Sequence, residues 1–445
     1  MSTLSTGESA QGIGGLRLPP GCRQKSGISD NFNYYGAVEV EDSQADFFEE
    51  KVQPINGFTS DPYEFVFEPM GDTFLCLNSM YLHYEARITK DGVNVDRNEP
   101  VAITNYPIAS IWKSVETKLN NVVINPTSSY LTAYKSYIDA ALSVRDPKSS
   151  YLRAGGFAID DPDKYDTHDD TNSGYKYRRN YCNGQRFNFT GKICSDFLCS
   201  NNHLAPGNKL SLRFTRMPDA FCLNTGTDTT SYRLEIKEIA IYVRRLNLFS
   251  NAIPKILDAR RPQRYSTIFT EMRDFPLAAG LKQWSTKISG GLIPKSLMIA
   301  FVETEAQVGS FKLNPFNFKH FDLSRINLKV NGKRVPEDPL RPDFENKRVS
   351  QAFNHLFMNT GKYRINSGSC LTLDQFQSGL TIFPFDLTPD QCNSYHSHAG
   401  REGTVEVELE WSKPLPKGIT VLCYQVSQQV IQLQGENSPP SISTY

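Results

Sequence analysis

Apolar and polar residues alternate along many short segments of the chain, and this two-residue period is typical of strands that bury one face. The period is clearest in four segments: Tyr63–Phe67, Met80–Ile88, Leu210–Phe214 and Val405–Trp411. In the last segment valine, leucine and tryptophan residues share one face, whereas three glutamates share the other. Sheets with one buried and one solvated face are typical of antiparallel strands. The pattern therefore predicts an all-β protein.

Two local features of the sequence predict details of the strands, namely a bulge and a hairpin. Within residues 234–243 the aliphatic residues occupy even positions up to Ile236 and odd positions from Ile239. A β-bulge near Lys237 and Glu238 would return both sets to one buried face. Further along the chain, Asn331-Gly332 separates two alternating runs, and this dipeptide supplies the two positive φ angles of a type I′ turn. We therefore expect a two-residue hairpin there.

Helical periodicity is rare. Residues 128–144 carry apolar and aromatic residues three and four positions apart, and Thr127 or Ser128 is available as an N-cap. Residues 349–358 show the same spacing. Each segment lies in a long connection between strand runs, so the sequence predicts one helix in each half of a β-rich chain.

The chain divides into two halves with short flanking segments. Residues 1–55 are rich in glycine, proline and acidic residues, which predicts an N-terminal arm. Residues 251–263 contain prolines and charges without strand alternation, which predicts a linker. We thus expect a first sandwich over 56–250, a second over 264–434 and a C-terminal tail over 435–445. The letters contain no internal repeat, so any similarity between the halves would be architectural.

Net charge, apolar runs and cysteine spacing exclude several classes of protein. The chain has 445 residues with 48 basic and 48 acidic side chains, so its formal net charge is zero. A neutral chain lacks the field that attracts polyanions, and we expect no sequence-specific binding of nucleic acid. No apolar run reaches the length of a transmembrane segment, and the N-terminus lacks the apolar region of a standard secretion signal. Nine scattered cysteines without a C-x-x-C motif predict reduced, packed thiols.

Candidate chemical sites all have a simpler structural interpretation. His396 and His398 could share one face of a strand as a metal site, although turn residues around them favour a polar loop. The aspartates of 160–170, with His168 among them, could bind calcium, but they lack the order of an EF-hand and favour a solvated loop. The familiar nucleotide-binding and hydrolase motifs are absent.

The cysteines and a group of arginines each allow two interpretations of their role. An activated thiolate is one interpretation of Cys370, Cys392 and Cys423, and core packing is the favoured one. A basic group near the proposed linker would either contact nucleic acid or form ion pairs between domains or subunits, and neutrality of the chain favours ion pairs. The group comprises Arg244, Arg245, Arg260, Arg261 and Arg264.

A family resemblance rests on motifs in the second half. They are the run Gly309–Phe321, the Asn331-Gly332 hairpin, Pro342-Asp343-Phe344 and the run Phe383–Asp390. In this order they resemble the hexon-like major capsid proteins of Polinton (Maverick) elements and adintoviruses, from about Ile293 to Val426. The motif residues, for which a structural role is expected, are Asn314, Pro315, Phe316, Phe318, His320, Asn331, Gly332, Pro342, Asp343, Phe344, Phe385, Asp386, Pro389 and Asp390.

The resemblance implies a double jelly-roll, which is a pair of eight-stranded antiparallel β-sandwiches with short helices in the connecting loops. It further implies a protein without enzymatic activity, metal or cofactor that forms a homotrimer and then a lattice of capsomers in an icosahedral virion. Minor or vertex capsid proteins would be partners, and assembly would occur in the host nucleus or cytoplasm. Two alternatives remain open at this point: a single jelly-roll minor or vertex capsid protein, and a carbohydrate-binding β-sandwich protein.

Overall fold

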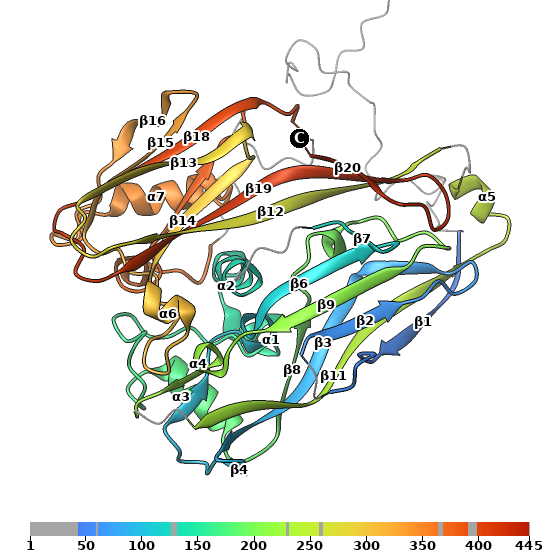
Figure 1. The fold of residues 1–445 in the computed structure, drawn as a ribbon, viewed down its shortest axis with the longest axis horizontal. Helices are drawn as coiled ribbons and strands as arrows, with labels where there is room; N and C mark the ends of the chain where they lie inside the picture. The colour runs from blue at the N-terminus through green and yellow to red at the C-terminus, as the bar shows by residue number, and fades with distance from the viewer. Residues whose placement is uncertain are drawn as a thin grey trace, which may run out of the picture. The chain divides into compact units, whose positions relative to one another are not determined.

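The computed structural model describes residues 43–58, 61–125, 131–227, 231–257, 261–363, 368–389 and 398–444 (Figure 1). The first half contains β1 Gln44–Val52, β2 Tyr63–Phe67, β3 Phe74–Lys90, β4 Val93–Asn94, β5 Val101–Ile103, β6 Trp112–Leu119, β7 Val122–Val123, β8 Phe187–Lys192, β9 Leu210–Arg216, β10 Leu223–Thr225 and β11 Tyr232–Leu248. The second half contains β12 Gln263–Leu277, β13 Gln283–Leu292, β14 Ser296–Glu303, β15 Leu323–Val330, β16 Lys333–Leu340, β17 Ile382–Asp386, β18 Glu402–Trp411, β19 Ile419–Leu433 and β20 Ser441–Thr444.

Helices occupy the connections between strands. The α-helices are α1 Pro107–Ser110, α2 Leu131–Ser143, α3 Ser173–Cys182, α4 Asp219–Cys222, α5 Ile253–Ile256, α6 Thr304–Val308, α7 Ser350–Asn359 and α8 Leu373–Gln377. Short 3₁₀ turns cover Pro147–Ser149, Tyr151–Arg153 and Phe197–Cys199. The two helices that the sequence predicts are confirmed as α2 and α7, although the proposed caps of α2 lie outside the described residues.

Both halves have the same strand order. In the second half, one sheet follows the order β12-β19-β14-β17 and the other β13-β18-β15-β16. In the first half, β1-β11-β3 with β8 beside β3 repeats the first order, and β2-β9-β6-β7 repeats the second. Eight strands that alternate between two antiparallel sheets in this order form a jelly-roll. The chain is a double jelly-roll, as the family resemblance implies, and the alternative with a single sandwich is wrong.

Aromatic residues join the two sheets of each sandwich. Tyr84 of β3 meets Trp112 of β6 with ring centroids 6.4 Å apart, and both side chains are buried. Phe301 of β14 meets Trp411 of β18 at 6.1 Å in the second sandwich. Each sandwich therefore has its own interior, built from the inward positions of the alternating strands.

The local strand predictions are confirmed. β2 spans the predicted Tyr63–Phe67, and β18 buries its valine, leucine and tryptophan face. The register of β11 against β3 shifts between Ile236 and Glu238, so the predicted bulge is present. Asn331 and Gly332 have φ of 52° and 78° and join β15 to β16 directly.

The flanking segments are shorter than predicted. Residues 44–52, which the sequence assigned to the arm, form β1 and pair with β11, so they supply the first strand of the first jelly-roll. Residues 441–444, assigned to the tail, form β20 and pair with β19 of the same chain. Within 251–263, α5 interrupts the expected linker and β12 begins at Gln263. The hydrophobic pattern did not predict these strands because their residues are largely exposed, and β1 has no fully buried position.

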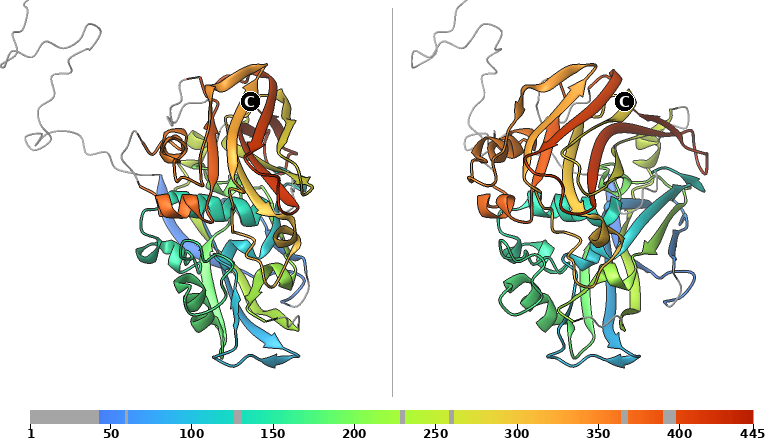
Figure 2. Two further views of the ribbon diagram at one scale, coloured as in Figure 1. Left: turned by 90° about the vertical axis from the view of Figure 1, so that its left-hand side faces the viewer. Right: turned by 60° about the vertical axis from the view of Figure 1, so that its left-hand side comes forward.

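The second sandwich rests on the first through its β12–β19 side. Gln429 Nε2 of β19 donates to the carbonyl of Ile124 at 3.2 Å, and Asn120 Nδ2 donates to the carbonyl of Ser438 at 2.7 Å. In both views of Figure 2, α2 lies between the strands of the two sandwiches. Residues 43–445 thus form one compact unit.

Candidate functional site at the junction of the sandwiches

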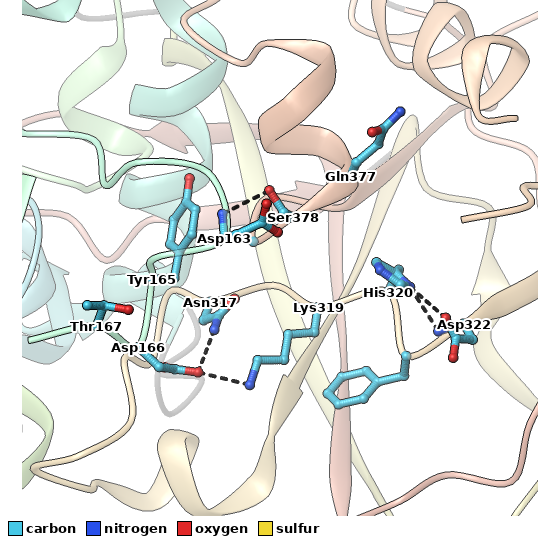
Figure 3. Close-up of a pocket in the computed structure, with 12 residues that line it drawn as sticks. Asp163, Tyr165, Asp166, Thr167, Asn317, Lys319, His320, Asp322, Gln377 and Ser378 are labelled. Atoms are coloured by element: carbon cyan, nitrogen blue, oxygen red, sulfur yellow. Dashed lines mark hydrogen bonds and ion pairs between the residues drawn. The ribbon is translucent and has the colours of Figure 1, made fainter. Parts of the chain in front are cut away.

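The motif run Gly309–Phe321 lies in the connection between β14 and β15, at the junction of the two sandwiches. It meets three segments of the first sandwich: α2, the loop of residues 157–170 that precedes α3, and the α4–β10 segment. Figure 3 shows part of this junction, where Asp163, Asp166 and Lys319 line a hollow of about 420 Å³. The site therefore consists of loops from both halves of the chain.

Aromatic stacking forms the buried part of the junction. Phe316 is fully buried and stacks on Tyr137 of α2 with ring centroids 4.4 Å apart. Tyr134 and Phe221 approach the same ring edge-on at 5.8 and 5.9 Å. Phe318 lies 6.0 Å from both tyrosines. All these partners belong to the first sandwich, so the two phenylalanines of the motif bind the halves together.

Asn314 provides the polar contacts of the junction between the sandwiches. Its Nδ2 donates to Asp160 Oδ2 at 3.2 Å and to the carbonyl of Tyr165 at 3.0 Å. Its backbone N–H donates to Asp166 Oδ1 at 2.9 Å, and its Oδ1 accepts from the N–H of Phe316 at 3.0 Å. A buried asparagine with this many partners fixes the backbone before Pro315, which is itself buried.

Lys319 links the charges around the hollow. Its ammonium lies 2.9 Å from Asp166 Oδ2 and 2.6 Å from Glu303 Oε1. Burial acts to lower the pKa of Lys319, but the two carboxylates outweigh burial and leave that pKa above its ordinary value. Lys319 therefore stays charged and connects the first sandwich, through Asp166, to β14, through Glu303.

His320 lies beside the hollow and is stacked on Phe344, with ring centroids 4.0 Å apart. Its Nδ1 accepts from the N–H of Asp322 at 2.9 Å. Burial lowers its pKa, against the opposing effect of the Asp322 carboxylate. The neutral, stacked ring is the state that this geometry favours, so His320 packs two motif segments together.

The remaining motif residues lie away from the hollow. Asn331 and Gly332 form the hairpin turn, where Asn331 Oδ1 accepts from the N–H of Thr404 at 2.8 Å. Pro342 is buried, and Asp343 accepts from Asn346. Phe385 is buried in β17, Asp386 accepts from Thr388, Pro389 is exposed, and Asp390 lies outside the described residues.

The acidic loop is structural and only partly solvated. Asp160 is fully buried and pairs with Arg178 of α3, with Oδ1 and Nη2 2.9 Å apart. Asp161 accepts from the backbone and hydroxyl of Ser173 at the start of α3. His168 contacts the carbonyl of Lys312 through Nε2 at 2.8 Å. Among the described residues, no group of three or more acidic, histidine or cysteine side chains is arranged to hold a metal.

The other candidate residues have packing partners. Arg245 is buried and pairs with Glu50 of β1 at 2.6 Å, so this ion pair lies inside the first sandwich and does not join the two domains as predicted. Arg260 lies outside the described residues. Burial raises the pKa of the Cys370 thiol to about 12 and also raises that of Cys423, so neither is an activated thiolate. His396 and Cys392 fall outside the described residues. No described helix has the length and apolar character needed to cross a membrane.

Sequence reasoning missed α3 and its buried Arg178. The helix is strongly polar and its buried positions include only two side chains of ordinary core type, Tyr175 and Cys182. Asn172 at its N-cap accepts from the N–H groups of Gly174 and Tyr175, which is the one signal in the letters that marks the start of the helix. The position of Arg178 against Asp160 depends on tertiary packing.

Comparisons with known proteins agree with this fold. A Sputnik virophage chain superposes with a TM-score of 0.62 at 12% identity, over 96% of this chain and 93% of that chain. A chain of the PBCV-1 virus capsid superposes with a TM-score of 0.58 at 10% identity, over 92% of this chain and 99% of that chain. The mavirus major capsid protein superposes with a TM-score of 0.53 at 9% identity, over 99% of this chain and 97% of that chain. The three structures come from a virophage, a virus capsid and a viral major capsid protein, and at identities of 9–12% the likeness is one of fold.

Sequence comparison finds a relative without an assigned role. The chain is 26% identical over 405 residues to the uncharacterized protein F54H12.2 of Caenorhabditis elegans, covering 86% of this chain and 94% of the relative. No family model matches the chain. The similarity to capsid proteins is therefore carried by the fold.

Proposed function

We propose that this protein is a major capsid protein whose trimers form pseudo-hexameric capsomers that assemble into an icosahedral shell. The observation that supports the proposal is the repeated strand order of the two sandwiches within one compact unit. Three copies of such a chain supply six similar sandwiches, and a heterologous contact that closes after three copies gives a ring. The function is then mechanical and needs no catalytic group or cofactor.

The junction supports this function because a shell subunit must hold its two sandwiches at a fixed angle. Phe316 and Asn314 of the second sandwich are buried against groups of the first. We assign to these motif residues the role of fixing that angle, and to Asn331-Gly332 the role of shaping the β15–β16 hairpin. A lattice repeats every subunit many times, so an error in the angle would accumulate across it.

We infer from the resemblance of its second-half motifs that the protein is a capsid protein of the Polinton or adintovirus type. The nematode relative supports this assignment, since an element integrated in animal genomes would leave related sequences there. Virions would contain the protein together with minor or vertex proteins, after assembly in the nucleus or cytoplasm. The residues before Ser43 are our candidate for binding such a partner, and deletion of residues 1–40 should reduce particle yield more than trimer yield.

The test of the proposal is the mass and shape of the purified protein. Light scattering coupled to size exclusion should give about three times the 50.2 kDa of the chain. Negative-stain images should show hexagonal particles. A monomer at all concentrations, with glycan binding on an array, would instead support the carbohydrate-binding alternative.

A further inference from the structure

The turn that leads from the motif run into β15 has a strained backbone. Phe321 and Asp322 have φ of 49° and 59°, and the N–H of Leu323 donates to the carbonyl of His320 at 2.9 Å. Two successive positive φ angles inside such a bond are typical of a type I′ turn, which glycine and asparagine favour and which is unfavourable for phenylalanine. Contacts outside the turn must therefore hold it in this conformation.

Two side chains hold the turn through hydrogen bonds. His320 lies beside Asp322, whose N–H donates to Nδ1 of the ring at 2.9 Å (Figure 3). Ser412, directly after β18, donates to the carbonyl of Asp322 through its N–H and its hydroxyl at 3.0 and 3.1 Å. A ring nitrogen accepts a hydrogen bond only while it carries no proton. The first of these bonds therefore exists only while His320 is neutral.

The ring of His320 is fixed in orientation and still accessible to solvent protons. It stacks on Phe344 with an angle of 5° between the ring planes, and 27% of its side chain is exposed. The same Nδ1 lies 3.6 Å from Oδ1 of Asp322. Protonation turns Nδ1 into a donor, so the ring would repel the N–H of Asp322 and attract the carboxylate of the same residue.

Charged groups from both sandwiches surround the ring and set when it gains a proton. They are Asp163, Lys319, Asp322, Asp343, Glu345 and Lys413. Lys413 lies 3.6 Å from Asp322 and 3.5 Å from Glu345. Burial lowers the pKa of His320, against the opposing effects of Asp322 and Asp163. The ring is therefore neutral at neutral pH and binds a proton below about pH 6.5.

The turn adjoins two contacts that join separate segments. Lys319 immediately precedes it and binds Asp166 of the first sandwich, while β15 of the second sandwich begins at Leu323. The stack of His320 on Phe344 joins the turn to the segment that precedes α7. A change in the turn would therefore reach both the junction of the sandwiches and this segment.

We propose that His320 is a pH-sensitive switch that holds residues 320–323 in the strained turn when neutral and releases them when protonated. In the released state Nδ1–H donates to the Asp322 carboxylate, the N–H of Asp322 binds water, and the backbone of Phe321 relaxes. Acid thereby loosens the junction at Lys319 while both sandwiches stay folded. The inference concerns a single chain and goes beyond the proposed function, because it holds whether or not the chain forms trimers.

Hydrogen exchange followed by mass spectrometry tests the switch on the full chain at about pH 7.5 and about pH 5. H320N is the locked variant, because an asparagine side chain accepts from an N–H two residues later and does not titrate in this range. H320F is the released variant, since it keeps an aromatic ring against Phe344 but has no acceptor. H355N is the matched control, because it removes a different buried histidine. Comparison at the same pH cancels the intrinsic dependence of exchange on pH.

At acid pH the amides of Asp322 and Leu323 should exchange roughly tenfold faster in the wild-type protein than in H320N, or more. At neutral pH the two proteins should exchange equally. H320F should exchange faster than wild type already at neutral pH, and H355N should follow wild type in this segment at both pH values. Equal exchange of wild type and H320N at acid pH would overturn the inference, as would an H320F variant that is as protected as wild type at neutral pH.

NMR titration of the labelled histidines provides a second measurement that leaves position 320 intact. The resonance of His320 is assigned by its absence in H320N. D322N removes the carboxylate that receives Nδ1–H, and asparagine tolerates the positive φ of this position. The pKa of His320 should be lower in D322N than in the wild-type protein. An unchanged or higher pKa would overturn the inference, because the Asp322 carboxylate would then not receive the protonated ring.

Discussion

Replacement of Phe316 by alanine tests whether the motif fixes the two sandwiches together. The ring is fully buried, and its aromatic neighbours Tyr137, Tyr134 and Phe221 all belong to the first sandwich. Removing a buried phenylalanine ring typically costs about 3–5 kcal/mol, because apolar transfer and the residual cavity both contribute. Single domains are stable by about 5–15 kcal/mol, so F316A should remove a large fraction of the stability that the junction provides.

Urea unfolding followed by tryptophan fluorescence measures this loss. Trp112 reports on the first sandwich, and Trp284 and Trp411 report on the second. The wild-type protein should unfold with both sandwiches coupled. In F316A the midpoint should fall, and the transition should broaden or separate into two, because the main aromatic contact between the sandwiches is lost.

Phe249→Ala is the matched control, since its ring is 50% exposed and surface substitutions usually change stability by less than about 0.5 kcal/mol. The reasoning would be refuted by an F316A variant that loses no more stability than F249A. It would also be refuted by a loss confined to the second sandwich, since the aromatic contacts of Phe316 lie across the junction.

Three further predictions concern the same region and its surroundings. Gly379→Ala should lower the melting temperature more than Gly332→Ala does. Both glycines have positive φ, but a Cβ at Gly379 would collide with the buried ring of Tyr165, whereas no atom lies within 4 Å of a Cβ at Gly332. Arg178→Met should cost about 3–5 kcal/mol by leaving Asp160 charged and unpaired in the interior, and D160N/R178M should recover part of the loss in urea titrations. Burial lowers the pKa of His355 to about 4, so as pH falls the unfolded chain binds this proton before the folded chain does. The contribution of His355 to the free energy of unfolding is therefore complete above about pH 6.5 and falls by up to roughly 3 kcal/mol toward pH 4. His355→Asn should flatten this dependence of stability on pH.

The strands and their register were predictable where one face is buried. Alternation in β2 and β18 sets which side chains point inward, and the phase change in β11 requires a bulge. β1 escaped prediction because it is an edge strand whose positions are almost all exposed. Its pairing with β11 satisfies backbone groups, and such pairing leaves little trace in the hydrophobic pattern.

The junction was predictable only in part. The motif Asn314-Pro315-Phe316 predicts a strand end, whereas β14 ends at Glu303 and the motif lies inside the connection that follows. Its partners lie about 95 to 180 positions earlier in the chain. The buried pair of Asp160 and Arg178 carries no local signal, since aspartate and arginine are ordinarily surface residues. Contacts of this range depend on the packing of two complete sandwiches.

The two sandwiches share a strand order without a repeat in their letters, and the structure explains how both are possible. A jelly-roll strand needs inward apolar residues at every second position, and many residues meet that need. The junction is more demanding, because Asn314 must satisfy Asp160, Tyr165 and Phe316 at once. Substitutions would therefore accumulate freely in the strands and rarely at the junction. On this view, the resemblance to capsid proteins of the same fold is expected to persist longest in the connection that joins the halves.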